Sequence, residues 1–275
     1  MKRGATPSNR TVAAATPAAP ARQRLSSVTS ALRLVKAFSE ERPSIGITAL
    51  AKQLGLAKST VHRLVTTLVA EGFLDQDPKD GQYRLGLLLF TLGTGVRRSL
   101  NVSVQAKAVL DRLKEKTSEN IHLSVLADLD IVYLFTLESS HAIGIRNSLG
   151  MRRPAHCTAE GRAILAHSPS QTLQRITQAG LKRQTTKTVT DTRTWLARLE
   201  STRVAGYAID EGECDDELRT IAAPIFDSQG GVIAAVSLAG PSSRLSKKAL
   251  RLLVPQVVDA ARVISQRMGW VPSGS

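Results

Sequence analysis

Two short helical patterns lie next to each other between residues 47 and 68. Apolar residues recur at helical spacing in both, first at Ile47, Leu50, Ala51 and Leu54 and then at Val61, Leu64, Val65 and Leu68. Gly55 interrupts the run and predicts the positive φ angle that ends the first helix, while the small Ala51 lets the second helix pack closely across it. Ser59 and Thr60 are the predicted capping residues of the second helix. The pattern indicates a helix-turn-helix.

The outer face of the second helix is polar and basic. With its apolar residues turned inward, this helix presents Lys58, Ser59, Thr60, His62, Arg63, Thr66 and Thr67, and Thr48 of the first helix joins them as a candidate DNA contact. Such a face can enter the major groove of DNA, where Arg63 can donate two hydrogen bonds to a guanine. An ordinary helical hairpin with a solvated polar face would show the same pattern, so the motif alone leaves both interpretations open.

The flanking segments favour the first interpretation. Residues 28–38 form a helical pattern that ends before Arg42 and Pro43, and apolar residues at 73–74 and 83–85 flank a turn-rich segment typical of a hairpin. Three helices followed by a two-stranded wing make a winged helix-turn-helix. The next helix, running to Arg98, is apolar on nearly all sides, and we interpret it as a linker and dimer contact; a simple core helix is the alternative.

The rest of the chain predicts an α+β domain with an antiparallel sheet. Two hairpins are expected, at 121–127 with 131–137 and at 218–226 with 232–238, and helices at 101–118, 158–167, 170–179, 191–204 and 246–268. The predicted organisation is a basic tail over 1–25, a winged helix-turn-helix over 26–86, a linker helix over 87–100 and a second domain over 101–270.

Composition agrees with an anionic partner. Of 275 residues, 37 are Lys or Arg and 23 are Asp or Glu, giving a net charge of +14. Residues 1–98 hold 15 of the basic and 6 of the acidic residues, so the excess is concentrated where the helix-turn-helix lies. Residues 1–25 contain no acidic residue and no apolar periodicity, so this segment is predicted to be a disordered basic tail. The tail could attract the DNA backbone weakly, could be an incidental extension, or could be a transit peptide.

The expected compartment is the cytoplasm. Two cysteines, Cys157 and Cys214, in a chain of this length favour a reducing environment over a disulfide scaffold. No apolar run approaches the length of a membrane span, and the N-terminus lacks the apolar core of a signal peptide. We therefore expect no membrane partner.

An enzyme is the main alternative function. His156, Cys157, Glu213 and Cys214 could converge as a metal site or as a nucleophile with its base, but their spacing matches no recognised ligand pattern. The sequence has no glycine-rich phosphate loop either, so we expect no catalysis, metal or cofactor. An RNA-binding protein would be expected to expose aromatic residues among the basic ones, and the chain has only ten aromatic residues.

Two further stretches are informative. Residues 150–163 form a loop that turns into a helix at Thr158, so the backbone N–H groups of Ala159 and Glu160 could receive a carboxylate. Residues 206–217 form a dense acidic loop that leads into the apolar segment 220–227.

Together with residues 58–64 and 83–86, these stretches give the chain from about 26 to 268 a close resemblance to the IclR family of transcriptional regulators. The resemblance implies a winged helix-turn-helix, a linker helix and a GAF-like effector-binding domain. It also implies a homodimer or a dimer of dimers on a double-stranded operator, controlled by a small organic acid. Repression is the commoner mode in this family, and activation also occurs.

The resemblance also implies a set of effector contacts: Ile145, Arg153, Ala159, Glu160, Asp210, Thr220 and Ser237. Three positions depart from the family pattern. Thr220 stands where Cys, Ser or Ala is usual, Arg153 where an apolar residue is often found, and Arg162 where Lys is usual. Arg153 could pair with a second acidic group of the effector or face solvent, and Asp210 could bind an effector hydroxyl or cap local backbone.

Overall fold

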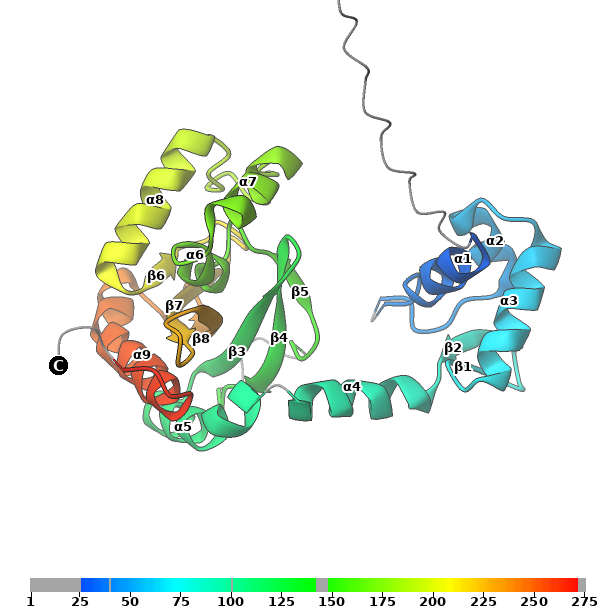
Figure 1. Cartoon of the computed structure of the whole chain (residues 1–275), viewed down its shortest axis with the longest axis horizontal. Coiled ribbons are helices and arrows are strands. Elements are labelled where there is room, and N and C mark those ends of the chain that lie inside the picture. The colour runs from blue at the N-terminus through cyan, green and yellow to red at the C-terminus, as the bar shows by residue number, and fades with distance from the viewer. Residues whose placement is uncertain (1–25, 40, 100, 142–147, 272–275) are drawn as a thin grey trace, which may run out of the picture. The chain divides into compact units, whose positions relative to one another are not determined.

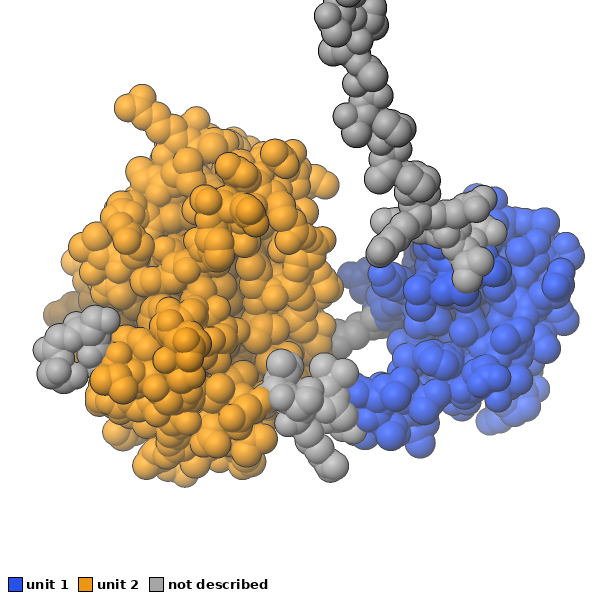
Figure 2. Space-filling view, in the orientation of Figure 1, with its two compact units in different colours: residues 1–93 blue, residues 94–275 orange. Residues whose placement is uncertain are grey.

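The computed structural model describes residues 26–39, 41–99, 101–141 and 148–271. The chain divides into two compact units, Met1–Gly93 and Thr94–Ser275, which Figure 2 shows in different colours. Each unit has a hydrophobic core of its own. The predicted tail over 1–25 and the predicted effector contact Ile145 lie outside the described residues. None of the helices in the described ranges is long and apolar enough to cross a membrane.

The first unit contains three helices and a two-stranded antiparallel sheet. Its elements are α1 (Ser26–Val35), α2 (Ile47–Leu54), α3 (Lys58–Ala70), β1 (Leu74–Gln76) and β2 (Tyr83–Leu85). The apolar sides of α2 and α3 meet as the periodicity predicts, because Leu50, Val61 and Val65 are fully buried together with Leu34 of α1 and Leu74 of β1. The predicted winged helix-turn-helix is confirmed.

The turn between α2 and α3 differs from the prediction at one point. Gly55 has the expected positive φ angle, 66°, and its N–H donates to the carbonyl of Ala51. However, α3 begins at Lys58 with Ala57 as its N-cap, so the prediction that Ser59 or Thr60 caps the helix is wrong. Ala57 has extended backbone angles and offers no side-chain acceptor. The hydroxyl groups of Ser59 and Thr60 therefore lie in the first turn of the helix.

The second unit is an α+β domain. After α4 (Leu87–Ser99), which crosses the boundary between the units, its helices are α5 (Asn101–Thr117), α6 (Ala159–Leu165), α7 (Ser170–Ala179), α8 (Thr192–Ala205) and α9 (Lys247–Arg267). Its strands are β3 (Asn120–Ala127), β4 (Asp130–Leu137), β5 (Arg152–Pro154), β6 (Ala208–Asp210), β7 (Leu218–Phe226) and β8 (Val232–Pro241). These pair in the order β5-β4-β3-β8-β7-β6, with every pair antiparallel.

The sheet lies between two layers of helices (Figure 1). On one face, α5 and α9 cover the apolar side chains of alternate strand residues, including Ile121, Ile221 and Val236. On the other face, α6 and α8 form a second core with Ala222 and Ala235. β7 and β8 are therefore buried on both sides, which explains their nearly continuous apolar sequences.

Two short edge strands were not predicted. β5 and β6 have three residues each and occupy the two edges of the sheet, within stretches that the sequence indicates as loops. Strands of this length carry too few residues for an alternating pattern. These two strands nevertheless fix where the following segments begin, because β5 leads into α6 and β6 leads into the acidic loop.

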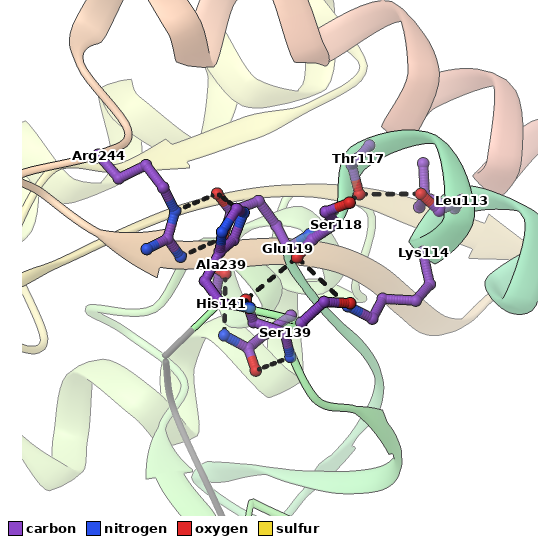
Figure 3. Close-up of polar contacts among 11 residues, drawn as sticks. Leu113, Lys114, Thr117, Ser118, Glu119, Ser139, His141, Ala239 and Arg244 are labelled. Carbon is purple, nitrogen blue, oxygen red and sulfur yellow. Dashed lines mark hydrogen bonds and ion pairs between the residues drawn. The ribbon is translucent and has the colours of Figure 1, made fainter. Parts of the chain in front are cut away.

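A buried ion pair joins the end of α5 to the connection between β8 and α9 (Figure 3). The Arg244 guanidinium donates from Nε to Oε1 and from Nη2 to Oε2 of Glu119, each at 2.6 Å. Around it, Asn120 accepts from the N–H of Ser139, and Lys114 donates to the carbonyl of Ser118. The Glu119 side chain is only 5% exposed, and its charge is balanced by Arg244 and by the His141 ring, whose Nε2 lies 3.9 Å from Oε1.

Candidate DNA-binding face and effector cavity

The outer face of α3 is an exposed polar surface. All eight predicted DNA contacts are exposed, namely Thr48, Lys58, Ser59, Thr60, His62, Arg63, Thr66 and Thr67. Val61 and Val65 point the other way and are fully buried, so core packing fixes the orientation of the face. The hydroxyls of Thr66 and Thr67 donate to the carbonyls of His62 and Arg63, at 2.9 and 3.0 Å. We call these eight residues, seven from α3 and Thr48 from α2, the α3 face.

The wing is electrostatically mixed. Arg84 on β2 lies 4.0 Å from the carboxylate of Asp75 on β1. Asp77 and Asp80 accept the backbone N–H groups of Lys79 and Gln82 and so form the turn. Three carboxylates beside two basic side chains leave little net attraction for phosphate, and the positive charge of this unit is better placed on the α3 face.

A small polar cavity lies in the second unit, and four predicted effector contacts line it. Its volume is about 30 Å³, and Arg153, Glu160, Asp210 and Thr220 are among its walls. That is space for about two water molecules. These four residues come from β5, α6, β6 and β7, which shows that the fold brings together positions far apart in the sequence.

The remaining predicted contacts lie beside the cavity. Ser237 on β8 does not line it but donates its hydroxyl to Oε1 of Glu160 at 2.7 Å. Ala159 is the first residue of α6 and belongs to the apolar core, so only its backbone could serve a ligand. The Thr158 hydroxyl caps this helix by accepting from the N–H of Gly161. Glu160 takes a hydrogen bond from its own backbone N–H, which competes with the role predicted for that group.

The start of α6 is held very close to the preceding loop. A Cβ atom added at Gly161 would lie 2.0 Å from the carbonyl oxygen of Ala155, a distance that no real contact allows. Glycine is therefore the residue that permits α6 to begin directly against this loop. The packing fixes the two neighbours of Gly161, which are Glu160 at the cavity and Arg162 in the same turn of the helix.

Burial raises the pKa values of three groups at the cavity. Burial raises the pKa of Asp210 to about 7, even though the backbone N–H of Glu213 donates to it at 2.6 Å. Burial also raises the pKa of Glu160 and raises that of Tyr133 well above its usual value. With a pKa of about 7, Asp210 is protonated below that pH and can then donate a hydrogen bond, as the hydroxyl of Tyr133 can.

His122 and Tyr133 line the cavity and were not singled out from the sequence. Burial lowers the pKa of His122 to about 4, and neither ring nitrogen has a hydrogen-bond partner among the described residues. Its ring lies 4.7 Å from that of Tyr133. The alternation of apolar and polar residues along β3 could have indicated His122: Ile121 and Leu123 alternate with His122 and Ser124, and all four side chains are buried.

The residues of the enzyme alternative have other partners. The ring of His156 pairs with the carbonyl of Lys182 at 2.9 Å, and Glu213 binds guanidinium groups. A hydrogen bond with the Cys214 thiol and burial raise the pKa of Cys157, which disfavours the thiolate that a nucleophile or metal ligand requires. Within the described ranges, no group of three His, Cys, Asp or Glu side chains could hold a metal ion. The geometry gives this alternative no support.

The class of protein follows from the first unit. An exposed basic recognition helix within a winged helix-turn-helix defines a DNA-binding transcriptional regulator. Residues 27–78 match the IclR helix-turn-helix domain, and residues 94–266 match the C-terminal domain of the bacterial transcriptional regulator IclR. The chain belongs to the IclR family.

Known relatives agree with this assignment over most of their length. The chain is 34% identical to the transcriptional regulator KdgR of Escherichia coli K12 over 90% of this chain and 94% of KdgR. It is 30% identical to the transcriptional repressor IclR of the same organism, over 91% and 93% of the two chains. An IclR homologue from Microbacterium hydrocarbonoxydans, solved in complex with 4-hydroxybenzoate, has a TM-score of 0.78 at 26% identity, over 88% and 99%.

Proposed function

We propose that this protein is a cytoplasmic repressor that holds an operator through the α3 face and changes its affinity when a small organic acid enters the cavity of the second unit. Residues 26–86 would bind DNA, the helix over 87–100 would link and dimerise, and residues 101–270 would sense the effector. The repressor assignment draws on the relative named as a transcriptional repressor. A dimer, alone or as a dimer of dimers, would place two α3 faces on paired half-sites.

The exposure of the α3 face carries the DNA-binding part of the proposal. Arg63 and Lys58 are exposed, and no ion pair of either is found among the described residues, so both charges are available to DNA. Arg63 suits a guanine edge because its guanidinium can donate two parallel hydrogen bonds, whereas Lys58 suits phosphate. The two residues would thus contribute differently, the first to sequence preference and the second to affinity.

The chemistry of the cavity supports an organic acid as the effector. A protonated Asp210 and the hydroxyls of Tyr133 and Thr220 could donate to a carboxylate, and Arg153 adds a positive charge at the wall. The relative that binds 4-hydroxybenzoate carries its ligand on the same fold. Ligand pockets typically measure ~300–1,000 Å³, so the cavity of about 30 Å³ must enlarge when it is filled.

Two measurements test the proposal. The first is fluorescence anisotropy with the DNA upstream of the protein's own gene, compared with a shuffled duplex of the same composition at several salt concentrations. We expect a salt-sensitive complex that prefers the upstream DNA by ~10³-fold or more. Equal affinity for both duplexes at every salt concentration would contradict the proposal.

The second measurement is a thermal-shift screen with hydroxy, keto and aromatic acids. An effector that binds only the folded state raises the melting temperature, and the same acid should weaken the complex with the upstream DNA. Thr220→Val, which removes a hydroxyl from the cavity wall while keeping its size, should reduce the shift. If no acid that binds alters DNA affinity, the sensing part of the proposal fails while the DNA-binding part stands.

A further inference from the structure

A second and larger hollow lies at the β6 edge of the sheet, and residues of α8 and α9 line it. Its volume is about 660 Å³. Six basic side chains line it, and we call it the basic groove: Arg162, Lys187, Arg198, Arg219, Lys247 and Arg251. The acidic residues in its lining are Glu211 and Glu213. α8 belongs to one helical layer and α9 to the other, so the groove opens where the two layers meet beyond the last strand.

The acidic residues do not neutralise the groove. A single oxygen of Glu213 accepts from both Arg162, at 2.9 Å, and Arg198, at 2.8 Å. Lys247 lies 2.6 Å from Glu211, and Lys187 lies 3.4 Å from Asp216. Three carboxylates therefore serve four of the six cations.

The other two cations are paired with no carboxylate of the residues that the structure describes. Arg219 donates to the backbone carbonyls of Ser242 and Leu245, which carry no charge. Arg251 is exposed and has no ion pair among the described residues. The groove consequently keeps an excess of about three positive charges within a concave surface, where the surrounding low dielectric strengthens attraction for anions.

Buried donors also remain unused in its walls. The Nε–H groups of Arg162 and Arg219 are buried and have no hydrogen-bond partner in the described part of the chain. Arg162 is only 4% exposed, so its guanidinium is held in place by the surrounding protein. An unpaired donor on a buried charged group is costly, and a ligand oxygen that reached it would recover that cost.

We infer that the basic groove binds a small polyanion, either a phosphate ester or a polycarboxylate, as a ligand separate from the effector. Guanidinium groups match the oxygens of both phosphate and carboxylate in pairs, and several of them converge here. The volume is in the range of small-molecule sites. The effector cavity shares none of the six basic residues with the groove, and Arg153 is the one basic residue other than His122 among the described residues of its lining.

The two sites meet at one loop. Glu213 donates its backbone N–H to Asp210, which lines the cavity, while its side chain holds Arg162 and Arg198 in the groove. Asp210→Asn, which keeps the acceptor oxygen for this N–H, should therefore leave polyanion binding in place. Because Asp210 lines the cavity and not the groove, polyanion binding by this variant tests the basic groove independently of the proposed effector site.

Isothermal titration calorimetry on the full chain at low ionic strength tests the inference, with pyrophosphate and citrate as probes and acetate as a singly charged control. We expect saturable binding of at least one probe and none of acetate. Arg251→Gln should weaken the affinity ~5- to 10-fold, and Lys247→Gln combined with it ~30-fold or more, as for the loss of charge-assisted hydrogen bonds. Preference for pyrophosphate would identify the ligand as a phosphate ester, and preference for citrate as a polycarboxylate.

Lys248→Gln is the matched control, because it removes one exposed charge from the same helix outside the groove. It should change the affinity less than twofold. Thermal melts of all variants check that they fold. The inference is overturned if neither probe binds the wild-type chain, or if Lys248→Gln weakens binding as much as Arg251→Gln does.

Discussion

The polar residues of the two units have opposite physical roles. On the α3 face they are exposed and surrounded by water, so they contribute little to folding and are available to a partner. In the second unit Glu119, Glu160, Asp210 and His122 are buried, so each one alters the stability of the fold itself. Residues of a surface site can therefore be replaced with little loss of folding stability. Residues of a buried site must be compatible with the folded core as well as with the ligand.

The buried ion pair gives the largest expected effect. Arg244→Leu would leave the buried Glu119 carboxylate with only the His141 ring at 3.9 Å, and we expect a loss of about 3 kcal/mol in the free energy of unfolding. Chemical denaturation measures this. Glu119→Gln together with Arg244→Leu removes both charges and should recover part of the loss. An Arg244→Leu variant as stable as wild type would show that the Glu119 carboxylate does not need Arg244 in order to remain buried.

Asp210 provides the next test, through pH. Its folded-state pKa of about 7 lies above the value near 4 of an unfolded aspartate, so the folded state binds the proton more tightly. The stability from this group is therefore largest at low pH and falls as the pH rises from about 4 to 7. Between pH 5 and pH 8 the wild type should lose about 2 to 3 kcal/mol that Asp210→Asn does not lose.

Denaturation curves of wild type and Asp210→Asn at both pH values measure this difference. Asp259→Asn serves as a control, since that carboxylate is exposed on α9 and its removal should not change the pH dependence. Parallel pH profiles for Asp210→Asn and wild type would contradict the buried, neutral state of Asp210. Anionic effectors should likewise bind more tightly at pH 6 than at pH 8, because ionised Asp210 repels them.

Arg63 tests the other side of the comparison. Arg63→Ala should weaken binding to the preferred DNA ~10-fold or more, with a smaller effect on the shuffled duplex, while the unfolding free energy stays within ~0.5 kcal/mol. Arg112→Ala, an exposed arginine of α5, is the matched control for charge. Loss of stability without loss of sequence preference would mean that Arg63 belongs to the fold and not to the DNA contact.

Ser59 gives the smallest expected effect. Since Ala57 occupies the N-cap, Ser59→Ala should change the stability of the first unit by less than ~0.5 kcal/mol, whereas loss of a true capping residue costs ~1 kcal/mol. Thermal denaturation compares it with Asp191→Ala on α8, where Asp191 does cap the helix by accepting the N–H of Thr194 at 2.8 Å. A larger loss for Ser59→Ala than for Asp191→Ala would reverse this assignment.

The sequence predicted the first unit better than the second because of the range of the interactions involved. The spacing of Leu50, Val61 and Val65 and the glycine at 55 are local signals, and they locate the helix-turn-helix within a single stretch. The N-cap is Ala57, whose side chain gives no capping signal, so the start of α3 was misplaced. Local pattern therefore defines the elements, but not always their first residue.

The effector cavity depends on contacts between distant segments. Arg153, Glu160, Asp210 and Thr220 were named through family resemblance, and the fold does bring them to one cavity. The raised pKa values of Glu160 and Asp210 could not be read from the sequence, because they follow from burial by strands that are remote along the chain. The basic groove was missed for the same reason, since Arg162 and Arg251 are widely separated in the chain and no local run of charge indicates their convergence.

Gly161 has a consequence for how the effector cavity and the basic groove can change over evolution. Its hydrogen atom faces the carbonyl of Ala155, and even the single methyl group of alanine would push the start of α6 away from that loop. Glu160 and Arg162 would then shift together, one in the cavity and the other in the basic groove. A lineage can thus alter ligand preference by replacing either neighbour, but replacement of the glycine itself would disturb two recognition sites in one step.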